Sequence, residues 1–132
     1  MRIGSLAAAV LLSVCSWQAA AQNVGVADHQ DFNLKNAQDL ADLCGAKSGE
    51  ALYAEAKQFC YGFLSGVMHF HDALATGPKG HRIVCPEGKV TRDDGVAIFV
   101  AWTKAHPDEA STMNPAEALV KAALDKWGPC QK

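Results

Sequence analysis

The chain has 132 residues, with 12 basic and 14 acidic side chains and a formal net charge of −2. This length suits a single domain. The lysines and arginines do not cluster as a phosphate-binding surface requires, and they form no basic helical face of the kind that binds bilayers. We therefore expect neither nucleic acid nor a membrane as a partner.

The N-terminus has the features of a bacterial secretory signal peptide in the correct order. Arg2 gives a positive start, residues 3–14 form a short and mainly apolar run, and three small residues end at Ala21. We predict that residues 1–21 are removed by a cut after Ala21 and that the mature protein is periplasmic. The alternatives are a buried N-terminal helix and lipidation of Cys15, and the downstream alanines favour cleavage over both.

Cleavage changes the cysteine count from odd to even. The mature chain would keep four cysteines, with 11 basic and 14 acidic side chains. In an oxidising compartment an even set predicts disulfides, here two of them. The cysteines are Cys44, Cys60, Cys85 and Cys130. Their spacing leaves all three connectivities open.

The first half of the mature chain predicts two helices. Residues 22–35 are polar and without period, which predicts a flexible lead-in to a domain over residues 36–132. Asn36 is a good N-cap for a short helix that Gly45 ends. A long helix is expected from about Ser48 to Ala75, because its apolar residues recur at steps of three and four and predict a core-facing stripe. The stripe consists of Leu52, Ala56, Phe59, Phe63, Val67, Phe70 and Leu74.

Gly62 and Gly66 are four residues apart, so they share one face of this long helix. Without side chains there, another backbone can approach closely. Packing within the bundle is the favoured interpretation, and a contact between subunits is the alternative.

The second half predicts a loop and two further helices. Residues 76–82 contain glycine and proline and predict a loop, followed by a short extended piece up to Pro86. Thr91 caps the third helix, with Asp94 at its N3 position, and Asn114-Pro115 starts the fourth. The third helix ends at His106-Pro107 and the fourth ends at Gly128-Pro129. The expected fold is all-α: a compact bundle of about four helices stapled by two disulfides.

The chain offers no convincing catalytic or metal site. His69 and His71 lie about 200° apart around a helix and cannot hold one ion together, although Asp72 and His81 are close by in sequence. A Cys–His catalytic pair needs a free thiolate, and structural disulfides are the better explanation of the cysteines. There is no C-x-x-C motif and no G-x-S-x-G motif. We expect no metal, no cofactor and no enzymatic activity.

Several motifs, in a fixed order, resemble those of the Rap/Tai family of immunity proteins. Cys60 begins a C-x-G-x-x-x-G-V pattern, Cys85 begins C-P-x-G-x-V-T, and His106-Pro107 and Pro129-Cys130 follow. The resemblance covers residues 36–130. It implies a small helical periplasmic protein, often a dimer, that binds a peptidoglycan amidase injected through type VI secretion and occludes its active-site cleft.

The resemblance also implies the disulfide pairing Cys44–Cys60 and Cys85–Cys130. If the long helix began at Ser48, Cys60 would lie two turns beyond the point opposite Cys44. The pairing therefore requires a steep crossing of the first two helices or a start nearer Tyr53.

Two loops are candidates for contact with the effector, because a blocker of a concave cleft needs a projecting element. The first includes His106, Pro107, Asp108 and Glu109, whose acids suit donors in a catalytic cleft. The second includes Pro78, Lys79, His81 and Arg82. The second loop departs from the family pattern, and since loops carry recognition, the identity of the effector does not follow from the resemblance.

The alternative function is that of a periplasmic helical chaperone or envelope structural protein. Five histidines would allow such a protein to open at low pH. That hypothesis predicts exposure of Phe59, Phe63 and Phe70 on acidification. A small enzyme would return as a hypothesis if two cysteines of the mature protein were free thiols.

Overall fold

The structure is a computed structural model that describes residues 25–131, so the predicted signal peptide and its cleavage after Ala21 lie outside the described residues. The described part contains five α-helices and one 3₁₀ helix. They are η1 (Asp31–Asn33), α1 (Ala37–Gly45), α2 (Tyr53–Ala75), α3 (Arg92–Ala105), α4 (Pro107–Ala110) and α5 (Pro115–Trp127). Over this part of the chain, β structure is limited to an isolated antiparallel bridge between Val84 and Pro129. The all-α prediction is confirmed.

Capping residues start three of the helices as the sequence predicts. The Asn36 side chain accepts hydrogen bonds from the backbone N–H groups of Gln38 and Asp39 at the start of α1. Thr91 and Asp94 form a reciprocal capping box at α3. At α5 the Asn114 side chain accepts from the N–H of residue 116, and Pro115 occupies the first turn. Each cap satisfies N–H groups that have no partner inside the helix.

The long helix α2 begins at Tyr53, five residues later than the pattern predicts. Gly49 has a φ of +98°, a left-handed conformation that a helix cannot continue. Turns connect Lys47 to Glu50 and Glu50 to Tyr53 before the helix begins. The later start moves Cys60 back toward α1, and this resolves the geometric difficulty of pairing it with Cys44.

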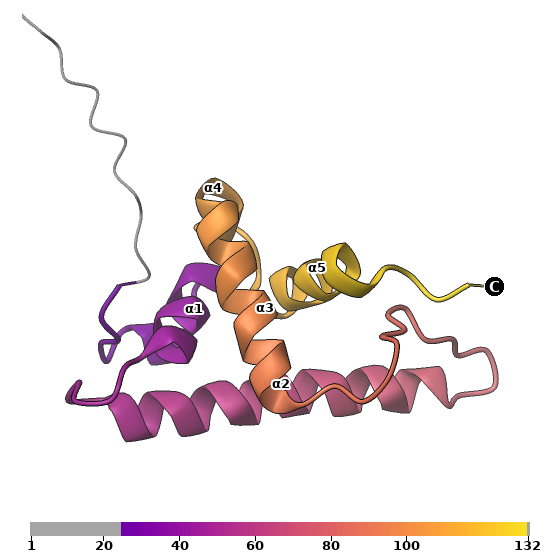
Figure 1. Ribbon diagram of the computed structural model, residues 1–132, viewed down its shortest axis with the longest axis horizontal. Helices are drawn as coiled ribbons and strands as arrows, with labels where there is room; N and C mark the ends of the chain where they lie inside the picture. Colours follow the sequence, from indigo (N-terminus) through magenta and orange to yellow (C-terminus); the bar gives the residue numbers. More distant parts are fainter. Residues whose placement is uncertain (1–24, 132) are drawn as a thin grey trace, which may run out of the picture.

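The core lies where α1 and α3 pack on α2 and where α5 packs on α1 and α3 (Figure 1). Phe99 and Leu40 are fully buried, as are Leu64 and Cys60 from α2. Small residues let the helices approach one another: a Cβ at Gly95 of α3 would be 3.3 Å from the Leu64 side chain. Trp102 completes this core, and its Nε1 donates to the Asp125 carboxylate at 2.9 Å.

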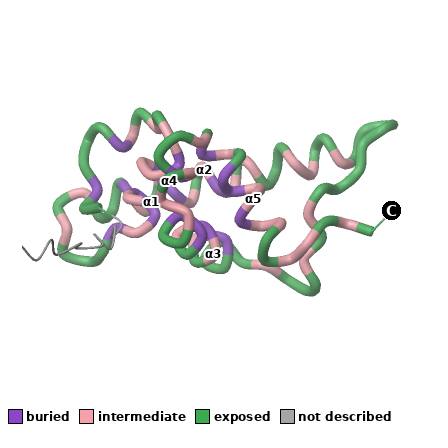
Figure 2. Tube along the Cα trace, turned by 90° about the horizontal axis from the view of Figure 1, so that it is seen from above, coloured by how far each residue is buried: buried purple, intermediate pink, exposed green. Residues whose placement is uncertain are grey.

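The predicted core stripe of α2 is wrong for its second half. Phe70 and Leu74 are 66% and 57% exposed, whereas the buried residues of α2 are Ala56, Cys60 and Leu64. The disulfide from Cys60 turns this side of α2 toward α1. Beyond Leu64 the helix extends past the bundle core, so its later apolar residues find little of the described chain to cover them (Figures 1 and 2).

Residues 25–35, expected to belong to a flexible lead-in, pack against α1 and α2. Ala27 and Asp31 are buried, and the Phe32 ring meets the Phe59 ring edge-on at 5.3 Å between centroids. The Gly25 N–H donates to the Asp42 carboxylate at 2.7 Å. The polar sequence of residues 25–35 does not predict these packing contacts, because each depends on a partner farther along the chain.

Asp42 gives the fold a pH dependence that can be measured. Burial raises the pKa of its carboxyl above the ordinary value, although Gln38 and Gly25 donate hydrogen bonds to it. A raised folded-state pKa means that the ionised group destabilises the fold, so the protein gains stability as pH falls through that pKa. We expect Asp42→Asn to raise Tm at neutral pH and to lose this advantage below about pH 4. An advantage that persists at low pH would show that the charge of Asp42 is not its cause.

Candidate protein-binding surface

Half of α2 and the segment that follows it form a projection, which we call the distal arm and define as residues 65–91. No residue from 65 to 94 is buried, although helix and loop here are continuous with the core (Figure 2). The loop after α2 extends past the end of the helix and returns alongside it to α3 (Figure 1). A connection this long without helices or strands of its own is uncommon in a small domain unless it has a function.

The distal arm presents apolar side chains to solvent. Met68 is 43% exposed, Phe70 66%, Leu74 57% and Ile83 45%. Single exposed apolar residues are ordinary, but a group of them on one element is typical of an interaction site.

Two hollows flank this surface. An open groove of about 550 Å³ runs along the glycine face of α2, between Gly62, Gly66, Phe70 and Leu74 on one side and Ala116 and Val120 of α5 on the other. A second hollow of about 270 Å³ lies between α2, α3 and α5, where Val84 and Val90 of the arm face Trp127. Both are lined mainly by apolar side chains.

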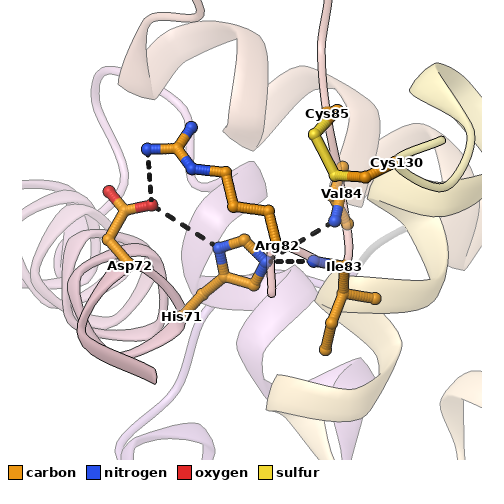
Figure 3. Close-up of a disulfide and its surroundings, with 7 residues drawn as sticks. All are labelled: His71, Asp72, Arg82, Ile83, Val84, Cys85 and Cys130. Atoms are coloured by element: carbon orange, nitrogen blue, oxygen red, sulfur yellow. Dashed lines mark hydrogen bonds and ion pairs between the residues drawn. A yellow bond between two sulfur atoms is a disulfide. The ribbon is translucent and has the colours of Figure 1, made fainter. Parts of the chain in front are cut away.

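The His71 side chain connects α2 to the segment of the arm that returns toward α3 (Figure 3). Its Nε2 lies 3.0 Å from the backbone N of Ile83 and 3.5 Å from that of Val84. Both neighbours are donors, so Nε2 accepts and the proton of the neutral ring is on Nδ1. Nδ1 is 3.6 Å from the Asp72 carboxylate, which lies 3.4 Å from the Arg82 guanidinium.

The two disulfides are Cys44–Cys60 and Cys85–Cys130, which confirms the pairing that the resemblance implies. The second joins the arm to the C-terminal tail, with 4.9 Å between the Cα atoms. Next to it the Cys130 N–H donates to the carbonyl of Ile83 at 3.1 Å. All four cysteines are paired, so the free thiols that would support a cysteine enzyme are absent from the described residues.

The turn at the tip of the arm requires glycine at one position. A Cβ at Gly80 would lie 2.0 Å from the carbonyl oxygen of Leu74, whereas a Cβ at Gly77 would lie 3.5 Å from the same atom. We expect Gly80→Ala to displace the loop and speed amide exchange over residues 76–84 about tenfold, with little change in unfolding free energy. Gly77→Ala is the matched control and should leave exchange as it is. Equal exchange in both variants would contradict this placement of Gly80.

The second predicted loop lies at the tip of the distal arm. Pro78, Lys79, His81 and Arg82 are all exposed. Arg82 is oriented by Asp72, while Lys79 and His81 make no side-chain hydrogen bond or ion pair within residues 25–131. The structure therefore brings these residues together with the exposed apolar side chains of α2.

The first predicted loop is instead a one-turn helix, α4 (Pro107–Ala110), packed against α3. The His106 ring stacks on Trp102 with 4.7 Å between centroids. Glu109 pairs with Lys121 of α5 and raises its pKa. Asp108 is exposed. Proline at the first helical position explains why this stretch is a turn of helix and not a loop.

His71 and Gly80 are the residues of this surface that sequence reasoning missed. From sequence, His71 is a candidate metal ligand only, and Gly80 is a general loop signal. Their roles depend on contacts between α2 and a segment about ten residues later, which no local pattern encodes. The available signal was the long Gly- and Pro-containing stretch between two well-capped helices.

The geometry defines a class of protein: a small helical domain, closed by two disulfides, with a projecting arm that exposes apolar side chains. Residues 25–131 contain no group of three His, Cys, Asp or Glu side chains placed to hold a metal ion. The model of the family described as Rap1a immunity proteins matches residues 36–130, and the chain belongs to this family.

Family membership implies a binding partner, a secreted effector against which the chain confers immunity. Proteins of this family are generally not enzymes. The two disulfides and the family together indicate an exported protein. No curated protein and no solved structure matches the chain. Among residues 25–131, every helix is too short or too polar to cross a membrane.

Proposed function

We propose that the protein is a periplasmic immunity protein that binds a peptidoglycan amidase delivered by type VI secretion and occludes its substrate cleft. The observation that carries this proposal is the distal arm: residues 65–94 include no buried residue, yet the arm is held in one place. Occlusion needs no catalytic group on the inhibitor. The predicted signal peptide, removed after Ala21, would deliver the protein to the compartment where such an amidase acts.

Occlusion works best with a rigid element, because ordering a flexible loop would cost binding free energy. The arm meets this requirement through His71, the Asp72–Arg82 pair and the disulfide to Cys130. Met68, which lies beside Arg82 and outside the glycine groove, supplies apolar contact area, and the side chains of Lys79 and His81 supply polar contacts at the tip. Of the two candidate loops we therefore favour the one with Pro78, Lys79, His81 and Arg82.

The residues His106, Pro107, Asp108 and Glu109 are the weaker candidates for effector contact. His106 and Glu109 already interact with Trp102 and Lys121, so an effector would have to displace those contacts. Asp108 remains exposed and serves as a matched control.

The groove along Gly62 and Gly66 supports a homodimer. A Cβ at either glycine would meet no atom of the described chain within 4 Å, so the favoured interpretation, packing within the bundle, does not explain them. On a two-fold axis through Gly66, antiparallel α2 helices would place Phe70 of each copy over Gly62 of the other. A two-fold interface requires a self-complementary face, and here the Phe70 side chain projects while Gly62 leaves space for it.

The effector is identified by capture with the mature domain, residues 22–132, produced in the periplasm so that its disulfides form. The bait is exposed to a lysate of the source organism, and bound proteins are identified by mass spectrometry. Recovery of one cell-wall amidase whose activity the domain inhibits supports the proposal. Recovery of many unrelated envelope proteins would favour the chaperone, for which the apolar surface of Phe70 is already exposed.

The contact surface is then tested with the captured amidase. We expect Lys79→Ala combined with His81→Ala to weaken binding about tenfold, which corresponds to a combined loss of about 1.4 kcal/mol from the two contacts. Asp108→Ala should leave affinity unchanged. The reverse pattern would move the contact to α4.

Dimerisation is tested by light scattering of Gly66→Leu and Gly66→Ala. Space is open at Gly66, so leucine leaves the monomer fold intact and fills the gap that the partner's Phe70 needs. We expect a monomer for Gly66→Leu and a weakened dimer for Gly66→Ala. A wild-type protein that is monomeric at all accessible concentrations, or a Gly66→Leu variant that still dimerises, would contradict this interface.

A further inference from the structure

The two disulfides lie in different environments. Cys44 is 2% exposed and Cys60 is fully buried, both within the helical core. Cys85 is exposed and Cys130 is half-buried, and they join two irregular segments (Figure 3). A dithiol in solution can reach the second bond without unfolding the protein, whereas it can reach the first only through unfolding.

The accessible disulfide is also the strongest anchor of the distal arm. Between the end of α2 and the start of α3, the other anchors are the hydrogen bonds to His71, the Arg82–Asp72 pair and the contact of the arm with the tail at Val84 and Pro129. These anchors lie at exposed or half-buried residues, where a hydrogen bond or ion pair stabilises little. Without the covalent bond, the segment of the arm that returns toward α3 would be held by weak contacts alone.

We propose that Cys85–Cys130 is a redox latch that sets the conformation of the distal arm. A thiolate of a protein dithiol, of the C-x-x-C class, attacks the sulfur of Cys85, the exposed residue of the pair, and forms a mixed disulfide, and Cys130 leaves as a thiolate that takes up a proton. The second thiol of the reductant then attacks the mixed disulfide and releases Cys85 as a thiol. The reductant ends as a disulfide, and the two cysteines have gained two electrons and two protons.

Opening the latch frees the arm while the core keeps its own disulfide. The consequence for effector binding rests on the proposed function, since it assumes that the arm makes the contact. The proposal of a latch does not rest on the proposed function, because the latch involves only residues 76–91 and the C-terminal tail of the isolated protein. With the disulfide intact, the arm already has its binding conformation. After reduction the arm is flexible, so ordering it on binding costs free energy.

The latch is tested on the isolated mature protein with dithiothreitol under native conditions, followed by alkylation and mass spectrometry. We expect alkyl groups on Cys85 and Cys130 only, and amide exchange over residues 76–90 about tenfold faster, with α1 and α3 unchanged. Alkylation of all four cysteines together, of none, or of two with unchanged exchange in the arm would overturn the proposal.

The matched control is the Cys85→Ser, Cys130→Ser double variant. It should show the fast exchange without reductant and no further change when dithiothreitol is added. A further change would mean that Cys44–Cys60 is also accessible, which contradicts a selective latch. Once an effector is in hand, reduction should weaken its binding to the wild type about tenfold and leave the double variant unaffected. Fast exchange in the arm without loss of affinity would keep the latch and refute the proposed contact surface.

Discussion

Replacing Phe99 by alanine is expected to lower the free energy of unfolding by about 3–5 kcal/mol, which is the typical cost of removing a buried aromatic ring. Phe99 is fully buried in α3 and lies in the cluster that α1, α2 and α5 share with it. Urea unfolding of the oxidised protein, followed by circular dichroism, measures the change.

The same substitution at Phe70 provides the control. Phe70 is 66% exposed, so Phe70→Ala should change the free energy of unfolding of the monomer by about 0.5 kcal/mol or less. The comparison must be made at a protein concentration that keeps the chain monomeric, because a dimer would add its own stability. Similar losses for the two variants would mean that the second half of α2 belongs to the core after all.

The Cys44→Ala, Cys60→Ala double variant is expected to lose about 3 kcal/mol, the loop-entropy contribution of a disulfide that closes a loop of this size. The two residues are separated by 16 positions and are buried in the core, so lost packing adds to the entropic effect. This loss is a large fraction of the free energy of unfolding of a typical protein, which is about 5–15 kcal/mol. Denaturant unfolding of the purified double variant measures it.

Loss of Cys85–Cys130 should have a smaller effect than its sequence separation of 45 implies. The loop model gives about 4 kcal/mol, because the unfolded chain gains freedom when the bond is absent. In this protein the folded state gains freedom too, since the arm loosens while the helices stay in place. A loss greater than that of the Cys44–Cys60 variant would contradict this partial cancellation.

Local chemistry explains which parts of the fold were predictable. Asn36, Thr91 with Asp94, and Asn114 with Pro115 cap helices through contacts within four residues, so the sequence contains the whole signal. The disulfide pairing was implied by the ordered motifs of the resemblance and not by spacing. The predicted start of α2 is too early because Leu52, the first apolar residue of the periodic pattern, lies just before the helix, and periodicity does not reveal the positive φ of Gly49.

The binding surface was only partly predictable, for a physical reason. Hydrophobic periodicity shows that Phe70 and Leu74 share one side of a helix, but it cannot say whether the element that covers them is in the same chain. A helix as short as α4 has no hydrophobic periodicity, so the sequence predicts a loop at Pro107. The His71 contact joins two segments whose approach depends on the whole bundle.

Because no residue from 65 to 94 is buried, this stretch contributes little to the hydrophobic core. Substitutions in this stretch change little of the buried area, so most of them should leave the free energy of unfolding nearly unaltered. Under the proposed function, a lineage facing a changed effector can therefore alter the tip of the arm, even its length, without first acquiring compensating changes in the core. Gly80 and Cys85 are the exceptions, because the turn at the tip leaves no space for a side chain at Gly80 and Cys85 forms the disulfide with Cys130.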